Sequence, residues 1–203
     1  ADHYITANVV PNAMTQAAPT GSVTPKVELT VVNRDMKKAK KRITATLRSP
    51  EGKDIQAITQ EIKFAKGDSI KQLTFHFNTL HNAALWTSET PVRYAVELAQ
   101  SDGKNEEQAF VTRYGFTKID ISKGFLEVND RRTFLKGANT QDTHPMHGRS
   151  IDIPMMIKDI QLMKQANMNA VRNSHYPRQA KMMAMFDYYG LFCMDEADME
   201  SHK

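Results

Sequence analysis

Apolar and polar residues alternate from about residue 5 to residue 116, and this period of two limits the folds that are open to the chain. The clearest runs are residues 27–31, 43–47, 73–77 and 94–98. Because successive side chains of a β-strand point to opposite faces, such alternation predicts half-buried strands with one wet face. Turn-forming clusters at 49–53, 66–69 and 101–105 separate the runs. Roughly seven short strands in about 115 residues are typical of an antiparallel sandwich of the immunoglobulin-like type.

The pattern changes in the second part of the chain, where apolar residues recur at helical spacing between short strand-like runs. The predicted strands are residues 134–139, 169–172 and 191–194, and the last is apolar throughout, as a buried parallel strand should be. Asp152 as N-cap and Pro154 in the first turn predict a helix that ends near Asn167. A second helix is predicted over about 179–189, where Gly190 ends it.

Polar residues gather directly after each of these three strands. The clusters are residues 139–147, 173–176 and 195–202. The order strand–helix–strand–helix–strand predicts a βαβαβ segment, and in a (β/α)8 barrel the carboxyl ends of the strands carry the chemistry. We therefore predict an all-β immunoglobulin-like sandwich in residues 1–118. An incomplete α/β segment, the start of a (β/α)8 TIM barrel with about three strands and two helices, is predicted in residues 119–203.

The composition argues against several classes of partner. The formal net charge is +4, and much of it lies in residues 37–42, which are predicted to form a solvated loop. No aromatic residue interleaves these cations, so no nucleic-acid partner is expected. No apolar run approaches the ~20 residues that span a bilayer, so no membrane partner is expected. Cys193 is the single cysteine and is predicted to be a buried thiol, while Trp86 is interpreted as a packing residue.

The second part contains the run N-A-V-R-N-S-H-Y-P-R-Q-A-K-M-M-A-M-F-D-Y-Y-G-L-F-C-M, residues 169–194, which resembles the first signature of glycoside hydrolase family 2. Upstream, F-L-K-G-A-N-T-Q-D-T-H-P-M-H-G, residues 134–148, is similar to its first barrel strand and loop. The stretch D-E-A-D-M-E-S-H, residues 195–202, resembles the magnesium-binding stretch of the β-galactosidase branch. The β-glucuronidase branch differs after the D-E pair and lacks the H-P-x-H-G run.

The resemblance implies three residues that contact sugar. His175, in S-H-Y-P, matches a histidine that hydrogen-bonds galactosyl hydroxyls near the transition state. Gln141 stands where many β-galactosidases have a second sugar-contacting histidine, and its amide can both donate to and accept from a hydroxyl. Asn139 matches a residue of the active-site face at a strand end. Without the surrounding motif, a histidine after a strand is more often a loop cap than a ligand.

Three further residues are implied to support the site. Arg172 matches an active-site residue that holds carboxylates in place, with a purely internal ion pair as the alternative. Asp195 and Glu196 close the third predicted strand, and the resemblance implies electrostatic support for them.

Glu200 and His202 match two protein ligands of the active-site Mg²⁺ of the family. A hard cation takes carboxylate oxygens and can take an imidazole nitrogen, but two protein ligands rarely make a closed site. The glutamates that act as nucleophile and as acid/base in the family are expected after Lys203. A protein of these 203 residues is therefore expected to be inactive by itself, because retaining hydrolysis needs both carboxyl groups.

The implied parent activity is that of a retaining β-galactosidase that removes terminal non-reducing β-D-galactose from β-galactosides. A β-glucuronidase or β-mannosidase of the same family, or a non-enzymatic immunoglobulin-like binding module, are the alternatives. The parent is expected to be a homo-oligomer. The 203-residue chain is expected to self-associate through the open barrel edge, because three parallel strands leave an uncovered apolar face. The sequence does not distinguish between the cytoplasm and the periplasm of a bacterium as the compartment of the protein.

Overall fold

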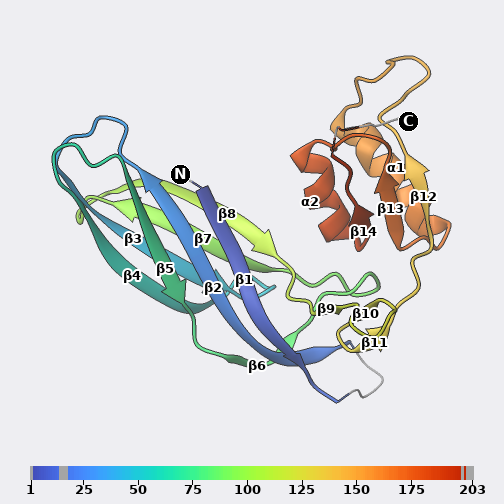
Figure 1. Cartoon of the computed structure of the whole chain (residues 1–203), viewed down its shortest axis with the longest axis horizontal. Helices are drawn as coiled ribbons and strands as arrows, with labels where there is room; N and C mark the ends of the chain where they lie inside the picture. Colours follow the sequence, from blue (N-terminus) through green and yellow to red (C-terminus); the bar gives the residue numbers. More distant parts are fainter. Residues whose placement is uncertain (1, 14–17, 198, 200–203) are drawn as a thin grey trace. The chain divides into compact units, whose positions relative to one another are not determined.

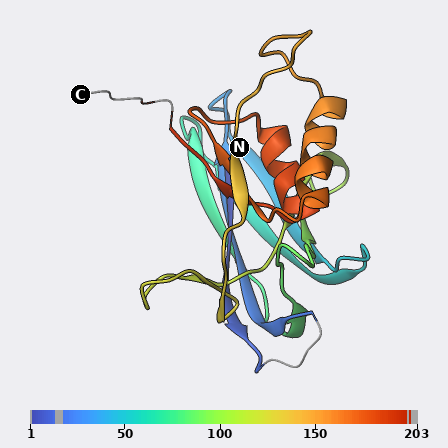
Figure 2. The same cartoon turned by 90° about the vertical axis from the view of Figure 1, so that its right-hand side faces the viewer.

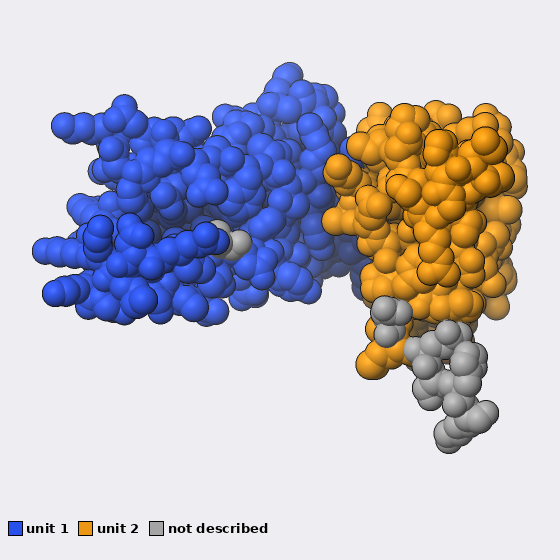
Figure 3. Space-filling view, turned by 90° about the horizontal axis from the view of Figure 1, so that it is seen from above, with its two compact units in different colours: residues 1–85, 92–118 blue, residues 86–91, 119–203 orange. Residues whose placement is uncertain are grey.

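The structure is a computed structural model that describes residues 2–13, 18–197 and 199. Two compact units make up the chain, coloured blue and orange in Figure 3. The first unit is Ala1–Leu85 with Val92–Lys118, and the second is Trp86–Pro91 with Ile119–Lys203. The sequence analysis assigned all of residues 1–118 to the sandwich, whereas the structure groups Trp86–Pro91 with the second unit.

The first unit contains two four-stranded antiparallel sheets (Figure 1). In one sheet β2 pairs with all three of its neighbours; the members are β1 (Asp2–Pro11), β2 (Thr20–Val32), β5 (Ile70–His76) and β6 (Leu80–Ala84). The other sheet has the order β4 (Asp54–Phe64), β3 (Ala39–Arg48), β7 (Tyr94–Ser101), β8 (Glu106–Tyr114). The described residues of the first unit thus hold eight strands where roughly seven were expected, and the predicted sandwich is confirmed.

The period of two in the sequence corresponds to the buried face of these strands. Every second side chain of β2 is buried, and Val23, Val27, Leu47 and Phe75 are 0% exposed. Fully burying an aliphatic or aromatic side chain contributes about 1.5–3 kcal/mol. The alternating residues therefore form the hydrophobic core of the sandwich.

A small antiparallel sheet, which the sequence analysis did not predict, begins the second unit. It consists of β9 (Ile119–Asp120), β10 (Glu127–Val128) and β11 (Arg131–Arg132). The tight turn between β10 and β11 places Asn129 and Asp130 in the left-handed region, with φ of 52° and 62°. Two-residue strands are too short to show a hydrophobic period, which explains why they were missed.

The predicted βαβαβ segment is confirmed as a three-stranded parallel sheet with two helices. The strands are β12 (Gly137–Thr140), β13 (Ala170–Asn173) and β14 (Phe192–Met194), with β13 in the middle. The helices α1 (Ile153–Gln165) and α2 (Ala180–Tyr189) lie on the same side of this sheet (Figure 2). Their core is built from Met156, Ile160, Met182, Phe186 and the strand residue Val171.

Local sequence signals determine where α1 begins and where α2 ends. The Asp152 carboxylate accepts a hydrogen bond from the Met155 amide at 3.1 Å, as an N-cap does. Gly190 ends α2 in the left-handed conformation with a φ of 79°. No helix in the described part of the chain is long and apolar enough to cross a membrane.

Trp86 is a packing residue, as expected, and it packs inside the second unit. Its side chain meets Phe192 edge-on with ring centroids 5.2 Å apart, and the residue is 7% exposed. The backbone oxygen of Ser88, two residues on, accepts a hydrogen bond from Lys164 Nζ at 2.9 Å. The segment Trp86–Pro91 is therefore part of the structure that surrounds β14 and the end of α2.

Candidate active site

The three parallel strands bring their carboxyl ends to one edge of the sheet. The register pairs Asn139 of β12 with Arg172 of β13, and Arg172 with Met194 at the end of β14. Asp195 and Glu196 follow directly. Asn139 and Arg172 are 33 positions apart in the sequence and Arg172 and Met194 are 22 apart, yet each pair lies side by side at the edge where βα barrels carry their chemistry.

Four of the residues singled out from the sequence form one polar cluster. Arg172 Nε donates to Glu196 Oε1 in an ion pair, and Arg172 Nη1 lies 3.5 Å from Asn139 Oδ1. The other carboxylate oxygen of this residue, Glu196 Oε2, lies 3.4 Å from His175 Nδ1. The His175 side chain is 46% exposed, so its ring is partly open to solvent while Nδ1 faces Glu196. The structure therefore connects Asn139, Arg172, Glu196 and His175.

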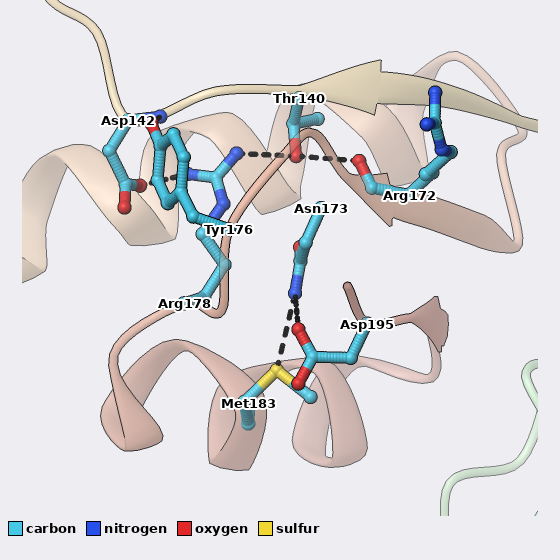
Figure 4. A network of polar contacts seen from close by, with 8 residues as sticks. All are labelled: Thr140, Asp142, Arg172, Asn173, Tyr176, Arg178, Met183 and Asp195. Carbon is cyan, nitrogen blue, oxygen red and sulfur yellow. Dashed lines mark hydrogen bonds and ion pairs between the residues drawn. The ribbon is translucent and has the colours of Figure 1, made fainter. Parts of the chain in front are cut away.

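Asp195 belongs to a separate contact. Its Oδ1 accepts a hydrogen bond from Asn173 Nδ2 at 2.9 Å, and the same amide nitrogen lies 3.6 Å from Met183 Sδ (Figure 4). Asn173 is 0% exposed, so its amide is fixed by these partners. The sequence analysis gave Asp195 and Glu196 the same supporting role, whereas in the structure the two carboxylates contact different residues.

Gln141 lies in the loop after β12 and is exposed. Its two chain neighbours are anchored: Arg178 Nη1 forms an ion pair with Asp142 Oδ1, and Arg178 Nη2 donates to Thr140 Oγ1 at 2.7 Å. The Asp142 amide also donates to the hydroxyl of Tyr176 at 2.9 Å. Sequence reasoning missed this set of contacts (Figure 4). The charges of Arg178 and Asp142 were its only sequence signal.

Burial changes the proton affinity of two groups behind the strand ends. Desolvation lowers the pKa of the Arg178 guanidinium. Desolvation is also the main cause that raises the pKa of the Cys193 thiol to about 11, with a smaller contribution from the charge of Asp195. Cys193 Sγ lies 3.9 Å from Met183 Sδ, in partly buried surroundings. The thiol therefore stays protonated at neutral pH, but Cys193 is only half-buried, whereas a buried thiol was predicted.

The two expected metal ligands, Glu200 and His202, lie outside the described residues. Within the described ranges, no three residues of the types His, Cys, Asp and Glu come together in a group that could hold a metal ion. Glu196, the described carboxylate nearest in sequence, is already engaged by Arg172 and His175. The magnesium site accordingly remains a proposal.

Comparison with known families identifies the class of protein that this fold and site define. Residues 4–116 match the family described as glycosyl hydrolases family 2, and residues 119–203 match the TIM barrel domain of the same family. The chain belongs to glycosyl hydrolases family 2. The resemblance that the motifs indicated is confirmed, as is the fold class that it implied.

Particular relatives in the family differ in what they are named for. The chain is 39% identical to a β-galactosidase of Kluyveromyces lactis over 119 residues. The matched residues make up 58% of the chain and 12% of the relative. A solved β-glucuronidase 2 of Bacteroides uniformis is 21% identical with a TM-score of 0.84, covering 99% of the chain and 24% of that protein. A β-glucuronidase of Bifidobacterium dentium is 19% identical with a TM-score of 0.83, covering 97% of the chain and 30% of that protein. At these identities the structures show the fold alone, and the chain spans a minor part of each relative.

Proposed function

We propose that these residues belong to a retaining β-galactosidase that hydrolyses terminal non-reducing β-D-galactose residues in β-galactosides. The observation that carries the proposal is the cluster of Arg172, Glu196 and His175 at the strand ends, in which the His175 side chain is partly exposed. The choice of galactoside over glucuronide is supported by the 39% identity to a β-galactosidase over 119 residues. The H-P-M-H-G run supports it further.

In this proposal each polar residue has a distinct part. Glu196 faces His175 Nδ1 at 3.4 Å, which orients the ring and leaves Nε2 as the atom that meets a sugar hydroxyl. Gln141 and Asn139 offer amide groups that both donate to and accept from hydroxyls. Arg172 holds the Glu196 carboxylate in place through a charge-assisted hydrogen bond.

We propose that none of the described carboxylates is the nucleophile or the acid/base. Glu196 is engaged by Arg172, and Asp142 is engaged by the buried guanidinium of Arg178. Asp195 accepts from the Asn173 amide. Retaining hydrolysis needs two carboxyl groups about 5 Å apart on either side of the scissile bond. The 203-residue chain is therefore expected to lack turnover by itself.

Magnesium is proposed as the metal of the complete site, with Glu200 and His202 as two of its ligands. A bound divalent cation would supply a strong positive field beside the reacting sugar. The described residue nearest to these ligands is Met199, which is 84% exposed and carries no oxygen or nitrogen ligand in its side chain. Direct binding measured by isothermal titration of the longer protein with Mg²⁺, for wild type and for Glu200→Gln, tests this proposal.

Chromogenic nitrophenyl glycosides test the proposed activity. The longer protein that carries these residues is assayed with the β-galactoside, the β-glucuronide and the β-mannoside, and the 203-residue chain is assayed beside it. We expect cleavage of the β-galactoside by the longer protein, with the β-anomer released first, and no cleavage by the 203-residue chain. Preference for the β-glucuronide or β-mannoside would refute the proposed substrate. Turnover by the 203-residue chain would refute the expectation that the nucleophile and the acid/base lie outside these residues.

A further inference from the structure

Arg178 is a buried cation that the proposed chemistry does not use. It follows the S-H-Y-P run and precedes α2, and its side chain is only 1% exposed. A charge taken out of water is costly unless it is paired and hydrogen-bonded, so its partners matter. Those partners are the Asp142 carboxylate on Nη1 and the Thr140 hydroxyl on Nη2, while the ring of Tyr176 lies 5.9 Å from the guanidinium carbon (Figure 4).

The two hydrogen-bonded partners of this guanidinium stand on either side of Gln141 in the chain. Two further contacts hold the same stretch of backbone. The Asp142 amide donates to the Tyr176 hydroxyl at 2.9 Å, and the Thr140 hydroxyl lies 3.4 Å from the backbone oxygen of Arg172. Both flanks of Gln141 are therefore tied to β13 and the loop that follows it, while Gln141 itself is exposed.

The planar fork of an arginine is suited to this double contact. Its nitrogens donate in fixed directions, so one guanidinium can bind a carboxylate with one nitrogen and a hydroxyl with another. A lysine ammonium is a point charge on a flexible stem and does not reproduce that geometry. The position of the loop after β12 is thus determined by a residue of the loop after β13.

We propose that Arg178 is a positioning residue that fixes where the Gln141 amide stands against a sugar hydroxyl. It thereby contributes to the selection among neutral hexosides that differ in the orientation of one hydroxyl. The inference rests on the proposed β-galactosidase function, because it needs a sugar at Gln141. Arg178 touches no sugar in this scheme; it acts through Thr140 and Asp142. A displacement of about 1 Å at such a contact can lower a rate a hundredfold, so a rigid anchor has a measurable effect.

A double-mutant cycle in the longer enzyme separates positioning from a general loss of structure. Kinetics with nitrophenyl β-galactoside are measured for Arg178→Lys, Gln141→Ala and the double variant. We expect Arg178→Lys alone to lower kcat/KM by about 10- to 100-fold. In the Gln141→Ala background the same change should cost less than about threefold, because the contact it positions is already gone. Arg131→Lys, an exposed arginine of β11, serves as the matched control. Additive losses in the cycle would overturn the proposal.

Hydrogen exchange on the 203-residue chain tests the anchor without any substrate. Arg178→Lys should speed exchange of the Asp142 amide, which donates to Tyr176, and should leave the amides of α1 unchanged. Thr140→Val removes one of the two guanidinium contacts and keeps the shape, so we expect a smaller change in the same direction. Unchanged exchange at Asp142 in both variants would overturn the positioning role. Failure of the wild-type enzyme to cleave a β-galactoside would refute the proposed function instead. Hydrogen exchange alone would then test whether Arg178 holds the loop after β12 in place.

Discussion

The indole Nε1 of Trp86 donates a hydrogen bond to the backbone carbonyl of Asp187 at 2.8 Å. Asp187 lies in the last turn of α2, where carbonyl groups lack partners within the helix. The backbone oxygen of Trp86 in turn accepts from Nδ2 of Asn129, a residue that is 1% exposed. A segment that lies between β6 and β7 in the sequence thus closes the carboxyl end of a barrel helix.

Replacing Trp86 measures what this closure contributes. Trp86→Phe keeps an aromatic ring against Phe192 but leaves the Asp187 carbonyl without its donor, so we expect the free energy of unfolding to fall by about 1 kcal/mol. Trp86→Ala also removes the ring and should cost about 3–5 kcal/mol. Circular dichroism in urea is the measurement, because Trp86 is the only tryptophan and its loss removes the fluorescence signal.

The control for this series is Ile121→Ala, at an apolar residue of the second unit that is 72% exposed. A surface substitution of this kind should change stability by no more than about 0.5 kcal/mol. Equal stability of Trp86→Phe and wild type would show that water replaces the indole donor without loss.

Gly190 offers a sharper comparison, because a second glycine of the same unit has the same backbone conformation. Gly190 has a φ of 79°, and a Cβ there would lie 2.3 Å from the backbone oxygen of Ser88. Gly124 has a φ of 81°, and a Cβ there would meet nothing within 4 Å. Gly124→Ala should cost the ~1–2 kcal/mol of a left-handed non-glycine residue, and Gly190→Ala should cost clearly more. Thermal unfolding of the two variants side by side gives the difference, and equal losses would contradict a contact between Gly190 and Ser88.

The elements that local sequence rules describe were predicted well. Asp152 caps α1 and Gly190 ends α2 because an N-cap side chain and a left-handed C-cap are determined by the residue itself and its immediate neighbours. The convergence of Asn139 and Arg172 also followed from the sequence, because parallel strands of one sheet end at the same edge.

Contacts that depend on the choice of a distant partner were not predicted. Arg178 and Asp142 are 36 positions apart, and nothing in either neighbourhood selects the other. Trp86 was expected to pack, yet its sequence context does not distinguish a sandwich core from the second unit. A hydrophobic pattern specifies that a side chain is buried, whereas the partner that covers it is determined by tertiary packing.

The Cys193 thiol provides a prediction about pH. Burial raises its pKa to about 11 from an ordinary 9.0, so at pH 8 the thiolate fraction should be about a hundredfold lower than in an unfolded chain. Alkylation by iodoacetamide at pH 8 should therefore be slow in the folded protein and fast in urea. Since the unfolded chain releases this proton first, stability should fall as pH rises from about 9 to 11 and be unaffected below that range. Because the chain has one cysteine, the labelling is unambiguous, and equal rates in the two states would contradict the raised pKa.

Self-association through the second unit is the remaining prediction from the sequence. A hollow of about 650 Å³ lies along the parallel sheet, lined in part by Leu126, Leu135, Phe192 and Met194. Apolar surface of this kind favours association, because burying it removes it from water. We expect sedimentation equilibrium to show dimers or larger species that weaken in Met194→Lys, since a charge on the lining is costly to bury. Met146→Lys, at a methionine that is 82% exposed in the loop after β12, is the matched control and should leave the association unchanged. A strictly monomeric wild-type chain would refute the prediction.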